Sequence, residues 1–332
     1  MRGRFVALRG NQGALAAGRR YLARDLNRGW SPEQLRELRA GPAAALVAED
    51  REQRTLADIQ ETLVGERRGP VVFLDLHSTS APSTPFLCFG DTLANRALAM
   101  RLPITKILGL EEVIDGAMLG YWADRGHTAI AIEAGQHDAP ETERRHQAAL
   151  WLCAVAIGLV ESALVPDLDA HHELLVRACA GRPSVVEVLH RQVVAEGDGF
   201  TMRPGFASFD VVRAGTVLAR DRSGDIRASR DGILLMPRYQ GQGDDGFFLA
   251  REVAPFWLRV SRLLRALPTE RLLPLLPGVS RDLDDPHTLS VNPDRLRHHL
   301  VDMMHLCGYR RRRQRGATLL FSRRPSEGRL LF

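Results

Sequence analysis

The sequence predicts an α/β fold, with a sheet covered by helices on both faces, then a small all-β domain and a helical C-terminal extension. Two strongly apolar strand patterns, at 71–76 and 129–135, are separated by helical stretches and followed by a long helical segment at 140–164. Short strand patterns punctuated by glycines then crowd residues 185–236, which is typical of a small sandwich or barrel. The chain of 332 residues is long enough for two or three such units.

We expect three units, at 1–168, 169–254 and 255–332. Ser31 and Pro32 form a helix start, with serine as cap and proline at the first helical position. The expected strands of the first unit are 4–8, 71–76, 86–89, 103–108 and 129–135, and its helices span 43–63, 91–101, 116–123 and 140–164. The third unit turns helical at Phe256 and closes with a strand at 317–321.

Charge and composition exclude several classes of protein. The net charge of +5 comes almost wholly from arginine, and the arginines are interleaved with acidic residues, which argues against a nucleic-acid interface. Residues 1–9 contain no apolar run typical of a signal peptide, and the most apolar segment, 148–160, is shorter than a membrane span. The four cysteines are far apart and form no CxxC pair, as in a reducing compartment. We therefore expect a soluble cytoplasmic protein without nucleic-acid or membrane partners.

The first group of candidate site residues is Arg20, Asn27 and Arg28. Two guanidinium groups and an amide offer several donors, and arginine grips a carboxylate with two parallel hydrogen bonds. The group is therefore suited to binding a substrate carboxylate. The alternative is a loop held together by salt bridges to Asp25.

The second group follows two buried strands. His77 follows the apolar run 71–74 and the residues Asp75 and Leu76, so it lies at the C-terminal end of a predicted strand. Three roles are open for it there: a metal ligand, a base, or a hydrogen-bonded loop residue. Alternation along 129–135 places Glu133 on one face with Ala129 and Ala131. A glutamate at the end of an apolar strand is costly to bury unless it is paired or has a function. A histidine ligand, a glutamate base and an arginine clamp together suit metal-assisted amide hydrolysis.

Three segments in this order, RYLARDLNR, DLHSTS and AIEAG, resemble the succinylglutamate desuccinylase and aspartoacylase family, which has a zinc-carboxypeptidase-like fold with a mixed sheet. Residues 200–219 and 232–249 are similar to the C-terminal domain of that family. The resemblance implies that His77 binds zinc and that Glu133 is the general base for zinc-bound water. It further implies that Arg20 polarises the scissile carbonyl, while Asn27 and Arg28 hold the free carboxylate of the substrate.

One departure from the family is that its Gly-x-His-Gly-x-Glu motif, which supplies two further zinc ligands, has no match between Met1 and Gly10. Catalytic zinc usually takes three protein ligands. Three explanations stay open: a chain without its natural start, a degenerate relative without activity, or ligands from elsewhere. We favour the first because all five site residues persist.

The sequence thus predicts a zinc-dependent deacylase that hydrolyses the amide of an N-acyl amino acid or a similar small carboxylate, impaired by the loss of two zinc ligands. The alternative is a non-catalytic relative that binds a carboxylate ligand or a protein partner. A missing first strand and helix would leave an unpaired sheet edge, so we expect a homo-oligomer or marginal solubility.

Overall fold

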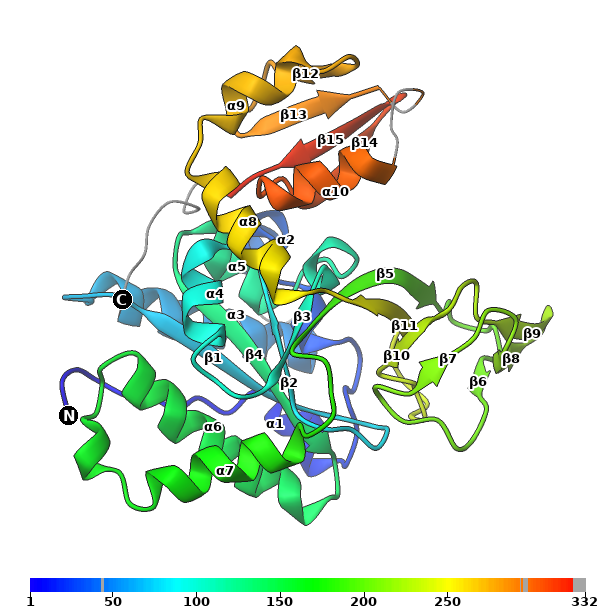
Figure 1. The fold of residues 1–332 in the computed structure, drawn as a ribbon. Coiled ribbons are helices and arrows are strands. Elements are labelled where there is room, and N and C mark those ends of the chain that lie inside the picture. Colours follow the sequence, from blue (N-terminus) through cyan, green and yellow to red (C-terminus); the bar gives the residue numbers. More distant parts are fainter. Residues whose placement is uncertain (43–44, 293, 295–297, 325–332) are drawn as a thin grey trace.

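The computed structural model describes residues 1–42, 45–292, 294 and 298–324, and a mixed eight-stranded sheet forms its centre (Figure 1). The strand order is β1 (Val72–Thr79), β4 (Thr128–Gln136), β2 (Phe86–Phe89), β3 (Thr105–Leu108), β5 (Val185–Val193), β11 (Asp245–Glu252), β10 (Gly232–Leu235) and β7 (Val211–Val212). The pairs β1–β4, β2–β3 and β3–β5 are parallel, and β2–β4 is antiparallel, as are all pairs beyond β5. The predicted α/β fold with a mixed sheet is confirmed.

Helices cover both faces of the first half of this sheet. Ile130 and Ile132 of β4 face a core shared with α4 (Leu93–Ala99), α6 (Pro140–Ala156) and α7 (Leu168–Ala178). Ala129 faces the opposite core, shared with α2 (Pro32–Ala40), α3 (Ala48–Gly65) and α5 (Met118–Asp124). Ser31 caps α2 as predicted, because its hydroxyl accepts a hydrogen bond from the Gln34 amide at 3.1 Å. The alternation predicted for β4 therefore holds, and it places Glu133 on the side of Ala129.

The strand predicted at residues 4–8 is wrong. These residues lie outside any strand, and the short helix α1 (Gln12–Ala16) follows them. Phe5 and Val6 are 55% and 45% exposed. A strand requires a hydrogen-bonded neighbour, and within the described part of the chain β1 pairs with β4 alone. The apolar run at 5–8 thus lacks the hydrogen-bonded partner that would make it a strand, and β1 is an edge of the sheet within the described residues.

The β-rich region is continuous with the main sheet. Its strands β5, β11, β10 and β7 extend that sheet, so hydrogen bonding crosses the boundary expected at residue 168. A separate three-stranded sheet consists of β6 (Thr201–Met202), β8 (Val217–Asp221) and β9 (Gly224–Arg227). The loop 236–244, between β10 and β11, lines the same cleft as β1.

The C-terminal region begins with the helices α8 (Pro255–Arg265) and α9 (Thr269–Leu272). It continues with an antiparallel sheet in the order β12 (Val279–Arg281), β13 (Thr288–Val291), β15 (Thr318–Ser322) and β14 (Arg311–Arg315), together with α10 (His298–Leu306) (Figure 1). The region expected to be helical with a terminal strand therefore also contains a four-stranded sheet. No helix in the described ranges is long and apolar enough to cross a membrane.

Candidate functional site

A cleft of about 2860 Å³ opens beside β1 and β4. The segment 2–8, the 3-10 helix η1 (Leu26–Arg28), the two strands and the loop 236–244 all contribute to its walls. The site residues predicted from the sequence all line this cleft, namely Arg20, Asn27, Arg28, His77 and Glu133. The structure therefore brings together residues that lie up to 113 positions apart in the sequence.

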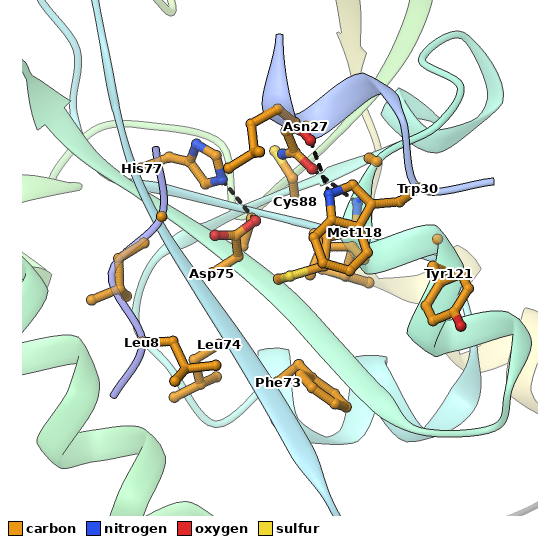
Figure 2. A pocket seen from close by; sticks show the side chains of 18 of the residues that line it. Leu8, Asn27, Trp30, Phe73, Leu74, Asp75, His77, Cys88, Met118 and Tyr121 are labelled. Carbon is orange, nitrogen blue, oxygen red and sulfur yellow. Dashed lines mark hydrogen bonds and ion pairs between the residues drawn. The ribbon is translucent and has the colours of Figure 1, made fainter. Parts of the chain in front are cut away.

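His77 and Glu133 are direct neighbours across the β1–β4 ladder. The imidazole Nε2 of His77 lies 2.8 Å from Oδ2 of Asp75, and Figure 2 shows this pair at the cleft wall. The negative charge of Asp75 raises the pKa of His77 to about 9. At neutral pH His77 is therefore an imidazolium held by a carboxylate.

Glu133 has a different environment. Burial raises the pKa of its carboxyl group, while the positive charges of His77 and Arg20 act in the opposite direction. Its Oε2 atom is buried and has no hydrogen-bond partner among the described residues. A buried carboxyl with a raised pKa and an unused oxygen is suited to take up and return a proton.

The described residues do not fit a catalytic zinc ion. His77 directs Nε2 at Asp75, and no group of three or more His, Cys, Asp and Glu side chains in the described ranges is arranged to hold a metal. Three protein ligands are the usual set for catalytic zinc. The role of His77 as a zinc ligand therefore remains a prediction, and the described residues do not supply the other two ligands that it would need.

Arg20 makes the salt bridge that the sequence offered as an alternative to carboxylate binding. Its Nε and Nη2 atoms donate to Oδ2 of Asp25 at 3.0 and 2.7 Å. Asp25 in turn caps η1, because its Oδ1 accepts from the Asn27 amide at 3.0 Å. The ion pair with Asp25 holds the Nε and Nη2 edge of the guanidinium group, and Arg20 still lines the cleft.

Arg28 and Asn27 are engaged inside the protein. Arg28 donates from Nη2 to Oδ2 of Asp245 at 2.8 Å, and Arg191 donates from Nε to the other oxygen of that carboxylate at 2.5 Å. Oδ1 of Asn27 accepts from the Met118 amide at 2.9 Å, which Figure 2 shows. A substrate carboxylate would have to compete with Asp245 for Arg28.

Three further cleft residues, Arg238, Asp245 and His137, have contacts that the sequence does not predict. Arg238 lines the cleft near Arg20, and its buried Nε has no hydrogen-bond partner in the described part of the chain. Asp245 holds Arg28 from 217 positions away, a separation over which no sequence pattern operates. His137 lies in the cleft just past the end of β4, and it shows no paired metal-ligand spacing in the sequence.

Comparison with solved structures finds similar folds at low sequence identity. Succinylglutamate desuccinylase from Vibrio parahaemolyticus is 16% identical, with a TM-score of 0.49 over 73% of this chain and 69% of that chain. Murine aminoacylase 3 is 19% identical, with a TM-score of 0.45 over 74% and 82%. An ectoine utilization protein from Ruegeria pomeroyi is 19% identical, with a TM-score of 0.49 over 73% and 72%.

No family model matches the chain, and no curated protein matches it. Likenesses at these identities and TM-scores carry nothing about activity. The chain resembles the succinylglutamate desuccinylase and aspartoacylase family in three ordered sequence motifs, and succinylglutamate desuccinylase structures are among the solved structures similar to it.

Proposed function

We propose that this chain is a deacylase-type amidohydrolase that acts on a small N-acylated substrate bearing a carboxylate. The observation that carries the proposal is Glu133, a carboxyl group with a raised pKa and an unpartnered oxygen, beside cationic His77 and within the electrostatic reach of Arg20. These are the proton carrier and the charge-stabilising donors that hydrolysis of an amide requires.

In this proposal Glu133 takes a proton from the attacking water and delivers it to the nitrogen of the leaving amine. Arg20 donates to the carbonyl oxygen, where negative charge develops as water adds. His77 stabilises the ionised form of Glu133, since its positive charge lowers the pKa that burial raises. Zinc would need ligands beyond His77 that the described residues do not supply, so no step is assigned to a metal.

Arg238 is a better candidate than Arg28 for the substrate carboxylate. Burial lowers the pKa of Arg238, and the nearby charge of Arg20 lowers it further. An anion beside Arg238 would offset this repulsion, whereas Arg28 already has Asp245. Arg238→Ala is expected to raise KM at least tenfold with little change in kcat. Arg28→Ala would instead lower the melting temperature, because Asp245 loses one of its two arginines.

The test is a panel of N-acyl amino acids with short acyl groups, assayed by release of the free amino acid. Glu133→Gln is expected to lower kcat by about 10²- to 10⁴-fold. Glu143→Gln, on an exposed glutamate of α6, is the matched control and should leave kcat unchanged. The assay is run after chelation and after addition of zinc, with metal content measured. Stoichiometric, tightly held zinc would show that ligands exist which the described residues do not reveal.

The second function is a non-catalytic binder of a carboxylate ligand. It is favoured by two observations: the described residues supply no three-ligand metal set, and the cationic side chains of Arg20 and Arg238 line the cleft. Calorimetry with the same N-acyl amino acids distinguishes the two functions. Micromolar binding without release of amino acid supports the binder and contradicts the deacylase.

A further inference from the structure

A bulge in β1 and β4 turns two side chains toward each other at the cleft. The ladder pairs His77 with Glu133 and Thr79 with Gln136, so that Ser78 alone stands opposite two residues of β4. Bulges of this kind redirect side chains and occur next to active sites. One of the two opposing residues is Gly135, which has a φ of +150°.

Gly135 is required at this bulge for two reasons. Its φ lies in a region that other residues rarely adopt, and a Cβ atom there would lie 2.7 Å from Oγ1 of Thr142 and 3.0 Å from Nη1 of Arg145. The backbone amide of His137 donates to the carbonyl of Thr79 at 3.0 Å. The position of His137 relative to Ser78 is therefore set by the backbone on both strands.

The side chains of Ser78, His137 and Gln240 form a hydrogen-bonded series. Oγ of Ser78 lies 2.8 Å from Nδ1 of His137, and Nε2 of His137 lies 3.4 Å from Oε1 of Gln240. Because Oε1 is an acceptor, Nε2 carries the proton in the neutral ring, and Nδ1 carries the lone pair that faces the serine hydroxyl. This is the arrangement of a nucleophile, its base and a third group that orients the base.

Cationic and amide N–H groups share the cleft with this series. Ser78, His137, Gln240 and Arg20 all line it. Nε of Arg20, which donates to Asp25, and Nε2 of Gln240 are each 3.9 Å from the position that a Cβ would take on Gly243, so the two side chains approach the same glycine. A carbonyl oxygen bound there would face the positive charge of Arg20.

We propose that Ser78 is a nucleophile, with His137 as its general base and Gln240 as a positioning residue, and that it accepts the acyl group of small esters and activated amides. Oγ of Ser78 bonds to the acyl carbon, and its proton passes to Nδ1 of His137. The bond from the acyl carbon to the leaving oxygen or nitrogen breaks as that atom takes the proton from His137. Water then cleaves the acyl-serine ester by the same proton transfers in reverse.

This inference uses the cleft of the proposed deacylase but does not depend on the role of Glu133. The probe is a small alkyl fluorophosphonate, with which a serine oxygen forms a bond to phosphorus while fluoride leaves and the proton goes to the base. The full chain is expected to gain one adduct, mapped to Ser78 by mass spectrometry. Ser78→Ala should lose the adduct, and His137→Ala should form it about 100-fold more slowly.

Two pairs of variants separate this role from a structural one. Ser162→Ala changes an exposed serine outside the cleft and should keep the full labelling rate. Gln240→Glu should keep the rate because a carboxylate still accepts from Nε2, whereas Gln240→Leu should slow it at least tenfold. Labelling at another serine, or a rate unchanged in His137→Ala, would overturn the proposal.

The same preparations are assayed for release of amino acid from N-acyl amino acids. An adduct at Ser78 without hydrolysis supports the nucleophile and contradicts the deacylase. Hydrolysis that depends on Glu133, with no adduct at Ser78, does the reverse.

Discussion

Individual residues show where a sequence pattern is sufficient and where it is not. Glu133 was placed correctly by strand alternation, because a period of two fixes the face of every residue in a strand. The sequence does not predict the partner of Arg28, because Asp245 lies at the start of β11, 217 residues later in the chain. The environment of His77 was half predicted: Asp75 is two positions away on the same strand, but its ion pair with His77 depends on side-chain rotamers that the sequence does not specify.

Lys106, the only lysine of the chain, is a residue whose burial has a measurable consequence. It lies in β3, is 5% exposed and donates from Nζ to the carbonyl of Leu102 at 2.8 Å. Burial lowers its pKa to about 8. Both folded and unfolded chains carry the proton below that pH, so the buried charge opposes folding there. Between about pH 8 and 10 the unfolded chain binds more protons, and stability rises with pH.

Lys106→Met is therefore expected to be more stable than the natural chain at pH 7, by up to on the order of 3 kcal/mol. The advantage should shrink as the pH rises from 7 to 9.5, since the natural lysine then loses its proton in the folded state. Urea unfolding of both proteins at several pH values gives the difference. A difference that is independent of pH would show that Lys106 does not titrate in this range.

Among the elements, those with a strong apolar period were predicted and those without it were not. The strands β1, β2 and β4 appear where the sequence predicts them. The helix predicted at 140–164 begins as expected at Pro140, but α6 ends at Ala156 and the 3-10 helix η4 (Ser162–Leu164) follows. The helix α7 was missed because its period is interrupted by Asp169, His171 and His172. The sheet of the C-terminal region was largely missed for a similar reason. Its strands are short, and β14 consists of four arginines and a glutamine, which no strand propensity favours.

The helix α8 is tied to the main sheet region by buried charge. Arg265 donates from Nη2 to Oδ2 of Asp91 at 2.8 Å, and both side chains are 0% exposed. Arg96, in α4, and Arg310 also contact that carboxylate. Together these ion pairs hold the pKa of Asp91 far below its usual range against the effect of burial. Without Arg265, Asp91 keeps its two other arginines, but the buried Asp91 carbonyl loses the donor Nη1 of Arg265 at 2.8 Å.

We expect Arg265→Met to lower the free energy of unfolding by about 1–3 kcal/mol, because a buried carbonyl loses its donor. Arg259→Met changes an exposed arginine of the same helix and should shift it by less than about 0.5 kcal/mol. Chemical denaturation of the two variants and the natural chain tests this directly. Equal stability of all three would mean that the buried ion pair does not anchor α8.

At the scale of the whole molecule, the edge strand β1 is the place where another chain could pair with the main sheet. It has a hydrogen-bonded neighbour on one side within the described chain, and Leu76 in its centre is 41% exposed. An exposed, partly apolar edge is a template for pairing with another chain. If the chain forms a homo-oligomer or has marginal solubility, we therefore expect the contact to be at the exposed edge of β1.

Leu76→Lys is expected to shift the chain toward monomer, because a charge on an edge strand opposes edge-to-edge pairing. Sedimentation velocity over a range of concentrations measures the shift. Leu164→Lys, at an exposed leucine outside the sheet, is the control and should leave association unchanged. Association that is identical in the natural chain and Leu76→Lys would place the interface elsewhere, and a stable monomer at every concentration would remove the expectation.

The continuity of the main sheet into the β-rich region has a mechanical consequence for the cleft. The loop that carries Arg238 and Gln240 is held at both ends by β10 and β11, and β11 follows β5 over seven paired positions. A hinge between the two regions would have to break that ladder. The β-rich region is therefore fixed relative to the first half of the main sheet, and access to the cleft does not depend on the two regions moving apart.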